Sequence, residues 1–210
     1  MSYLYTAIGD SLTTGFGALP GNGFVPTYRR MAEGTLRTQV YSQNLGVNGL
    51  TSGELEQRLR YPVYQQALRD ANIITISIGG NDLIQAAKAI RRTPARESQI
   101  LSQSLAECKR NFTDIVRTVY GIKEGSRSRY ILRVVGLYNP HPEVREGDAW
   151  VTQFNRYAAQ FSNQVYGFAD IFPIFTRRGR ELLSIDQVHP NGRGYKVMAE
   201  QLHRLGYGYL

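Results

Sequence analysis

The chain has 210 residues, 42% of them hydrophobic and 20% charged, a balance that excludes an intrinsically disordered protein. Its single cysteine, Cys108, excludes an internal disulfide framework and a metal cluster built on cysteines. The formal net charge of +8 is compatible with anionic partners, but the arginines are scattered and no zinc-finger or RNA-binding aromatic signature accompanies them. We therefore expect no nucleic-acid partner.

The length predicts a single domain over residues 1–210. No basic segment followed by an apolar core opens the chain, and no apolar stretch is long enough to span a membrane. We therefore expect a cytoplasmic protein without a transmembrane segment. The sequence leaves open leaderless export, spore association, peripheral contact with anionic lipid and the oligomeric state.

The first predicted element is a buried strand that ends at a serine. The apolar run from Tyr3 to Ile8 stops at Gly9-Asp10-Ser11, and small, flexible residues follow it. In an open α/β sheet, ligands bind at the edge where the carboxyl ends of the strands lie. The sequence therefore places Ser11 at a candidate site.

Strand and helix patterns alternate along the rest of the chain. The predicted strands cover residues 3–8, 36–45, 73–78, 130–137 and 165–172. The predicted helices cover 24–34, 51–71, 82–90, a longer segment after Pro94, 150–164 and a final segment after Pro190 whose inner face carries Tyr195, Met198, Leu202 and Leu205.

Local signals set several of these limits. Gly34 predicts the end of the first helix, and Thr51 followed by Glu54 fits a capping box at the start of the second. Pro62 interrupts that second helix. The run 73–78 is β-branched and nearly all apolar, which is typical of a central parallel strand covered on both faces.

Alternating strands and helices indicate βαβ units and a mostly parallel sheet with helices on both sides. The predicted fold class is α/β: a three-layer α/β/α sandwich around a flavodoxin-like central parallel sheet of about five strands. Since the carboxyl ends of parallel strands share one edge, the loops that follow the first three strands should lie close together.

Those three loops are rich in glycine and polar side chains. They are Gly9-Asp10-Ser11, Asn44-Leu45-Gly46 and Gly79-Gly80-Asn81-Asp82. Glycine lets the backbone approach a ligand and exposes amide donors, and Asn81 offers a side-chain amide that is neutral at every relevant pH. A nucleophilic serine needs such donors for the oxyanion that it creates.

A base and its partner stand late in the chain. Asp186 and His189 are three residues apart on a loop before the final helix. This spacing lets the Asp186 carboxylate reach the ring nitrogen of His189 that catalysis does not use, which would fix the tautomer. Ser11, His189 and Asp186 are therefore the candidate nucleophile, base and orienting acid.

Four sequence blocks resemble those of the GDSL or SGNH hydrolase family of lipases and acylhydrolases. The blocks are Gly9-Asp10-Ser11-Leu12, Gly46 within residues 44–49, Gly80-Asn81-Asp82, and Asp186 with Val188-His189-Pro190. A lone Gly-Asp-Ser-Leu string would be weak support, but here four blocks stand in family order over almost the whole chain. The size and the absent leader are similar to compact bacterial lipase-like members, some of which are spore-associated.

The resemblance implies a serine esterase or lipase that hydrolyses carboxylic esters through an acyl-enzyme. Ser11 would be the nucleophile, His189 the general base and then acid, and Asp186 the orienting residue. The oxyanion hole would consist of the backbone amides of Ser11 and Gly46 and the side-chain amide of Asn81. This chemistry needs no metal and no organic cofactor.

The sequence leaves the substrate open. Apolar residues near the predicted edge favour a small-molecule or lipid ester, phospholipid included, with a short to medium acyl chain. These candidate substrate-binding residues are Leu50, Leu83, Ile84, Tyr138 and Val188. A carbohydrate acetylesterase and a thioesterase stay as alternatives, because the same machinery serves them.

An alternative hypothesis is that the protein is not an enzyme. It would then be a flavodoxin-like binding module in which Thr13, Thr14 and Gly15 hold a phosphate. This hypothesis leaves the late histidine loop unexplained. Two other histidines are assigned no chemistry: His141 lies between prolines and is expected at the pocket rim, and His203 is expected on the surface or in packing.

Overall fold

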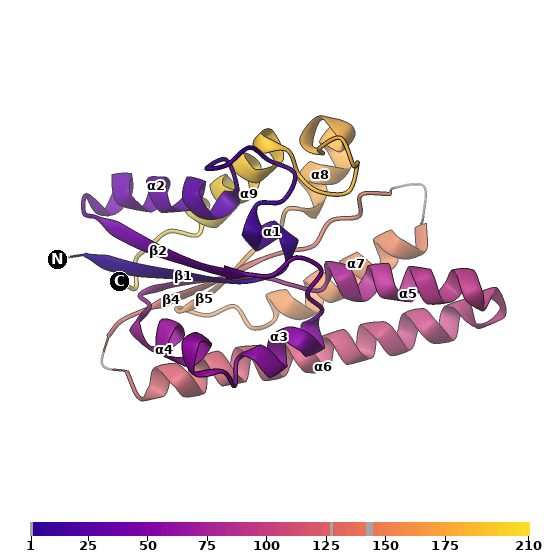
Figure 1. The fold of residues 1–210 in the computed structure, drawn as a ribbon, viewed down its shortest axis with the longest axis horizontal. Helices are drawn as coiled ribbons and strands as arrows, with labels where there is room; N and C mark the ends of the chain where they lie inside the picture. The colour runs from indigo at the N-terminus through magenta and orange to yellow at the C-terminus, as the bar shows by residue number, and fades with distance from the viewer. Residues whose placement is uncertain (1, 127, 142–144) are drawn as a thin grey trace.

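The computed structural model describes residues 2–126, 128–141 and 145–210. The central element of these residues is a five-stranded parallel sheet (Figure 1). Its order is β2-β1-β3-β4-β5. The strands are β1 (Tyr3–Gly9), β2 (Val40–Gly46), β3 (Ile73–Ser77), β4 (Ile131–Val135) and β5 (Tyr166–Ala169). This is the flavodoxin-like order, so the predicted fold class is confirmed.

The ends of β1, β2 and β3 lie at the same level of the sheet. Gly9 pairs with Gly46 on one side and with Ser77 on the other. The three loops that follow these strands therefore emerge together at the carboxyl edge. Every residue of β3 is buried, as its β-branched composition predicts.

Helices cover both faces of the sheet (Figure 1). On one face lie α1 (Ser11–Thr14), α2 (Phe24–Leu36), α8 (Phe172–Arg178), η2 (Gly179–Leu182) and α9 (Gly192–Arg204). On the other face lie α3 (Ser52–Arg58), α4 (Pro62–Asp70), α5 (Gly80–Arg92), η1 (Pro94–Arg96), α6 (Glu97–Glu124) and α7 (Arg145–Ala159). No helix in these described ranges is long and apolar enough to cross a membrane.

Each helical layer packs on the sheet through its own hydrophobic core. On one side, Phe112 of α6 meets Phe154 of α7 edge to face, with ring centroids 5.4 Å apart. On the other side, Tyr28 of α2 meets Tyr5 of β1 in the same way at 5.7 Å. Burying one large apolar side chain stabilises the folded state by about 1.5–3 kcal/mol. Both helical layers therefore stabilise the sheet whose carboxyl edge carries the three loops.

Two helix limits differ from the sequence expectation. The helix α2 continues through Gly34 to Leu36, because an exposed glycine inside a helix costs only about 1 kcal/mol. The helix predicted over 150–164 begins and ends five residues earlier, as α7. Glu146 and Asp148 stand in its first turn, where acidic side chains favour the helix amino terminus.

The C-terminal third also departs from the expected pattern. The strand predicted over 165–172 ends at Ala169, and Phe172 instead begins α8, where Asp170 Oδ1 accepts a hydrogen bond from its N–H. Pro173 in that first turn favours a helix start. Leu205 was expected on the inner face of the last helix, but it follows α9 and is more than a third exposed.

The two ends of the chain lie close together, at the end of the sheet opposite the three loops (Figure 1). The last residues are fixed there by contacts with the sheet and α2. Arg133 of β4 donates a hydrogen bond of 2.8 Å from Nη2 to Gly206 O, and Tyr207 stacks on Tyr28.

Candidate active site

Ser11 is the first residue of α1, directly after β1 and its cap. Asp10 Oδ1 accepts a hydrogen bond of 3.0 Å from the Leu12 N–H and so caps this short helix. Gly9 lets the chain turn this close to β3, because an added Cβ would lie 2.1 Å from Ser77 O and its φ is +140°. The residues before the serine therefore set its position at the carboxyl edge.

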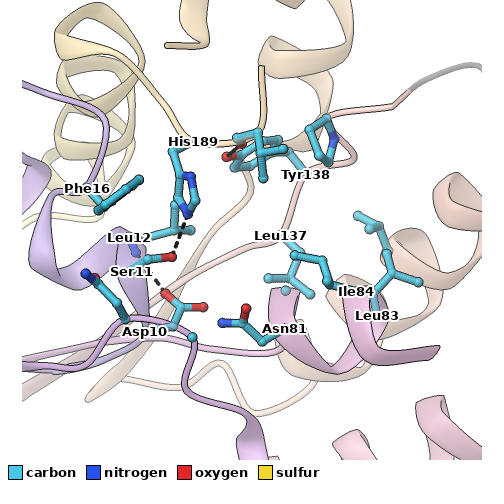
Figure 2. A pocket seen from close by; sticks show the side chains of 16 residues that line it. Asp10, Ser11, Leu12, Phe16, Asn81, Leu83, Ile84, Leu137, Tyr138 and His189 are labelled. Carbon is cyan, nitrogen blue, oxygen red and sulfur yellow. Dashed lines mark hydrogen bonds between the residues drawn. The ribbon is translucent and has the colours of Figure 1, made fainter. Parts of the chain in front are cut away.

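Three side chains from opposite ends of the sequence form one hydrogen-bonded series. His189 Nε2 lies 3.0 Å from Ser11 Oγ (Figure 2), and His189 Nδ1 lies 2.6 Å from Asp186 Oδ2. An ionised carboxylate only accepts, so Nδ1 carries a proton and Nε2 presents a lone pair to the serine hydroxyl. The structure thus brings together the three side chains that the sequence singled out, in an order suited to nucleophilic catalysis.

Asp186 is held by hydrogen bonds from its own loop. Its Oδ1 accepts from the N–H groups of Val188 and His189 at 3.0 and 2.9 Å, and from Ser184 Oγ at 2.7 Å. Desolvation raises the pKa of Asp186, but these donors and the His189 ring outweigh it and hold that pKa well below its usual range. The carboxylate is therefore ionised at neutral pH.

Asp10 is a second carboxylate at the site, and it is almost fully buried. Besides capping α1, its Oδ1 accepts a hydrogen bond of 2.9 Å from Ser77 Oγ, which also contacts Thr13 Oγ1. Burial raises the pKa of Asp10 to about 6, although the hydrogen bonds from Ser77 and Leu12 oppose this rise. Asp10 is thus a structural hydrogen-bonding residue whose charge titrates below neutral pH.

Asn81 and Gly49 bring amide donors to the pocket that contains Ser11. Asn81, in the first turn of α5, donates one Nδ2 hydrogen to Leu50 O at 3.0 Å, which fixes the amide and leaves its second hydrogen available. Gly49 has a φ of +78°, and its N–H has no acceptor among the residues that the structure describes. Both groups are therefore able to serve a ligand.

Gly46 does not take the position expected from the sequence. It ends β2, its N–H donates to Asn44 Oδ1 at 2.9 Å, and it does not line the pocket. An added Cβ would lie 2.8 Å from Thr13 Cγ2, so this glycine serves the close packing of β2 against α1. The free amide comes three residues later, and the Asn48-Gly49 pair is the turn signal that could have identified it.

The pocket beside Ser11 has a volume of about 210 Å³ and a mainly apolar wall. Four of the five expected substrate-binding residues line it, namely Leu83, Ile84, Tyr138 and Val188. The exception is Leu50, whose side chain is buried in the core and does not line the pocket. Leu50 contributes through its backbone, because its carbonyl orients Asn81.

Sequence reasoning did not assign five further apolar residues to the pocket, which are Leu12, Phe16, Leu137, Pro140 and Val151. Phe16 packs edge-on against the His189 ring, with centroids 4.7 Å apart, on the side of the pocket opposite Leu83 and Ile84 (Figure 2). Val151 lies on α7, and no motif connects it to the site. Phe16 stands between Gly15 and Gly17, and an aromatic residue this close after Ser11 was a usable signal in the sequence.

Tyr138 connects the loop after β4 to the histidine loop. Its hydroxyl donates a hydrogen bond of 2.5 Å to Val188 O, and its ring stacks on Phe175 of α8 with centroids 4.3 Å apart. Burial raises the pKa of Tyr138 well above its usual value, so the hydroxyl stays protonated and remains a donor. The pocket wall and the loop that carries His189 are therefore fixed to each other.

The residues proposed for a phosphate site are already engaged. Thr13 Oγ1 donates to Ile8 O, and Thr14 Oγ1 donates to Asn48 Oδ1 at 2.6 Å. Of the other histidines, His203 contacts Tyr207 through Nδ1, and His141 is exposed and does not line the pocket. Among the described residues, no cluster of three or more His, Cys, Asp or Glu side chains is arranged to hold a metal ion.

Comparison with known proteins finds the same pattern over the length of the chain. The model of the GDSL-like lipase/acylhydrolase family matches residues 7–197. A protein of Bacillus licheniformis named spore germination lipase LipC is 35% identical over 212 residues, which cover 100% of this chain and 99% of that protein.

Solved structures show the same fold. The lipase Lip_vut3 from a goat rumen metagenome superposes with a TM-score of 0.91 at 34% identity, over 98% of both chains. Axe2, an acetylxylan esterase from Geobacillus stearothermophilus, superposes with a TM-score of 0.68 at 18% identity, over 96% of this chain and 93% of its own. At that identity the second likeness concerns the fold alone.

Proposed function

The chain belongs to the GDSL-like lipase/acylhydrolase family and is a carboxylic ester hydrolase, and on that premise we propose that it hydrolyses short to medium acyl esters, lipid esters among them, through an acyl-enzyme on Ser11. One observation carries the proposal: the unbroken series from Ser11 Oγ through the His189 ring to Asp186. The cytoplasmic location expected from the sequence stays a prediction.

In the first half-reaction, Ser11 Oγ attacks the ester carbonyl while His189 Nε2 takes the hydroxyl proton. The proton then passes from His189 to the leaving alcohol, and the acyl group stays on Ser11 as an ester. In the second half-reaction, His189 Nε2 takes a proton from water as the water attacks this ester. The same proton returns to Ser11 Oγ when its bond to the acyl carbon breaks and the carboxylic acid leaves. Asp186 holds the Nδ1–H tautomer and stabilises the imidazolium formed in each half.

Three donors support the tetrahedral oxyanion in this scheme. They are the N–H of Ser11, the N–H of Gly49 and the free Nδ2 hydrogen of Asn81. Gly49 replaces Gly46 in this role because the Gly46 N–H is already bonded to Asn44. Donors fixed before the reaction stabilise the developing charge without reorganising, and each such donor contributes about 10²–10³ in kcat.

The acyl chain fits the apolar side of the pocket, between Leu83 and Ile84 on one wall and Tyr138 on the other (Figure 2). The alcohol part then lies towards Phe16 and Asn48. A volume of about 210 Å³ is below the roughly 300–1,000 Å³ of sites for drug-sized ligands. This size supports short to medium acyl chains.

The nucleophile is tested with a fluorophosphonate probe and with p-nitrophenyl butyrate. We expect one probe per chain, attached to Ser11, and Ser11→Ala should abolish labelling and lower kcat/KM by at least about 10³-fold. Ser102→Ala, on the exposed surface of α6, is the matched control and should leave both unchanged. Labelling that persists in Ser11→Ala would contradict the assignment.

The substrate class is tested by comparing p-nitrophenyl esters of increasing chain length with a phospholipid, an acetylated xylo-oligosaccharide and an acyl thioester. We expect the highest kcat/KM for a short to medium acyl ester. A preference for the sugar acetate or the thioester over every simple acyl ester would overturn the acyl-ester proposal and favour the corresponding alternative.

A further inference from the structure

Four large apolar side chains are exposed around the mouth of the pocket. Phe16 and Ile84 line the pocket on opposite sides and are 49% and 38% exposed. Leu19 and Ile185 are 75% and 101% exposed and belong to the two loops on the Phe16 side, three residues after Phe16 and four before His189. Single exposed apolar residues are ordinary, but a group of them at one opening marks an interaction surface. We call these four residues the apolar rim.

Two loops of the apolar rim run side by side. An added Cβ on Gly17 would lie 3.0 Å from His189 Cβ and 3.0 Å from Ser184 Oγ, so the loop of Phe16 and Leu19 packs against the loop of Ile185. Further along, a Cβ on Gly192 would lie 3.8 Å from Asn22. The exposed side chains of both loops therefore belong to one continuous surface beside the catalytic histidine.

Exposed basic side chains stand on the elements that carry or precede the rim residues. On α5, Lys88 and Arg91 follow Ile84 by four and seven residues, so they share its helix face and extend away from the mouth. On α8 and η2, Arg177 and Arg180 precede Ile185 and are exposed. None of the four forms an ion pair with an acid that the structure describes, whereas the neighbouring Arg178 is paired with Glu181.

An anionic lipid surface fits this combination. Apolar side chains enter the boundary between head groups and acyl chains, while lysine and arginine at the margin attract anionic head groups by about 1 kcal/mol each. The net charge of +8 favours the same encounter over longer distances. The apolar pocket opens from this surface to Ser11, so an ester-bearing lipid docked there could enter it. Docking of a partner protein would make no use of that opening.

We propose that the apolar rim, with Lys88, Arg91, Arg177 and Arg180 around it, is the face by which this enzyme docks on an anionic lipid surface. The inference rests on the proposed function, since docking there brings the pocket mouth onto the ester-bearing lipid. The side chains of His189 and Asp186 are 23% and 39% exposed, so the loop that carries them lies at the surface beside this face.

Binding is measured by vesicle sedimentation with Ser11→Ala protein, so that hydrolysis does not alter the lipid. We expect binding to phosphatidylglycerol vesicles to be at least about tenfold tighter than to phosphatidylcholine vesicles, and to weaken as salt is added. Adding Leu19→Ser and Ile185→Ser should weaken binding to phosphatidylglycerol by about tenfold or more, because both apolar anchors are removed.

The matched control is Tyr61→Ser with Val63→Ser, two side chains that are each 53% exposed at the start of α4, in the opposite layer. This pair should bind vesicles like the parent. In the Ser11 background, Leu19→Ser/Ile185→Ser should hydrolyse p-nitrophenyl butyrate at the unchanged rate, since neither residue lines the pocket.

Three results would overturn the inference: no vesicle binding, equal binding to both lipids, or equal weakening by the rim and control pairs. Failure of the proposed function looks different. In that case the parent enzyme does not hydrolyse the soluble ester p-nitrophenyl butyrate. Vesicle binding by Ser11→Ala is measured without hydrolysis, so it still tests the docking face by itself.

Discussion

Asp10 and Asp186 are two carboxylates of one site whose surroundings shift their pKa values in opposite directions. Asp186 receives hydrogen bonds from its own loop and stays ionised, whereas Asp10 is buried and its pKa rises to about 6. This divergence follows from burial in one case and from hydrogen bonds to the charged form in the other. It also makes the stability of the protein depend on pH in a predictable direction.

The expected effect of Asp10 on stability follows from its two pKa values. The folded value of about 6 exceeds the ordinary value of 3.8, so the folded state binds a proton more tightly than the unfolded state. The ionised form is the unfavourable one in the fold, and stability due to Asp10 therefore increases as pH falls from about 7 towards 4. Asp10→Asn keeps a side-chain oxygen as the helix cap and removes this dependence.

We therefore predict that Asp10→Asn is more stable relative to the parent at pH 8 than at pH 4.5, by about 2 kcal/mol. Urea unfolding of both proteins at the two pH values measures this difference. If the gap between them is the same at both pH values, the pKa of Asp10 is not raised in the folded protein.

The sequence predicted some residues of the site and did not predict others. Ser11, Asp186 and His189 were identifiable because their chemistry and spacing are specific. Gly46 and Gly49 were harder to separate: the Asn48-Gly49 pair was a turn signal, but the bond that occupies the Gly46 N–H is visible only in the structure. Such a contact depends on the final path of the backbone.

At the scale of elements, α3 and α5 are joined by a carboxylate in the first turn of α5. Asp82 accepts hydrogen bonds from the Ser52 N–H and hydroxyl at 3.0 and 2.6 Å, and Asn111 of α6 also donates to that hydroxyl. Since Asp82 follows Asn81 directly, this junction holds the turn that presents the proposed oxyanion donor. The arrangement connects helix packing to the geometry of the site.

Asp82→Ala should lower the free energy of unfolding by about 1–3 kcal/mol, because the Ser52 donors are left without their acceptor. It should also lower kcat for p-nitrophenyl butyrate, since the first turn of α5 loses its anchor. Urea unfolding and steady-state kinetics measure the two effects.

Thr51→Ala is the matched control for Asp82→Ala. It breaks the capping box at the start of α3, the helix that carries Ser52, and it removes no contact with α5. We expect it to cost about 1 kcal/mol of stability and to leave kcat unchanged. An equal loss of kcat in both variants would mean that Asp82 acts only through general stability.

The elements that the sequence predicted well are those with strong local signals. The capping box of Thr51 and Glu54 is present, Pro62 begins α4, and the β-branched run of β3 is buried throughout. Limits that depend on tertiary contacts were missed. Gly34 did not end α2, and the start of α7 before Trp150 carries no strong apolar period.

At the scale of the whole molecule, the site exists only when the sheet is assembled. Ser11 follows β1, Asn81 follows β3, and His189 comes from the loop before the last helix. The sequence predicted that these loops meet, through the general rule for parallel sheets. It did not predict that Val151 of α7 completes the pocket, because that residue reaches it through helix packing alone.

Esterase activity and the folded structure should therefore be lost over the same range of urea concentration. Trp150 is the single tryptophan, is buried and stacks on Phe154, so its fluorescence reports on the core between α6 and α7. We expect the midpoints of the fluorescence change and of the loss of esterase activity to coincide. Activity lost at clearly lower urea would indicate that the loops at the carboxyl edge open before the core does.

The position of the chain ends has a practical consequence. Both lie at the end of the sheet opposite the pocket, and Arg133 and Tyr28 fix the last residues there (Figure 1). A purification tag, a fusion partner or a covalent link to a bead joined at either end would point the open pocket away from its attachment. The enzyme is thus suited to immobilisation on a solid support, with its substrate arriving from the free side.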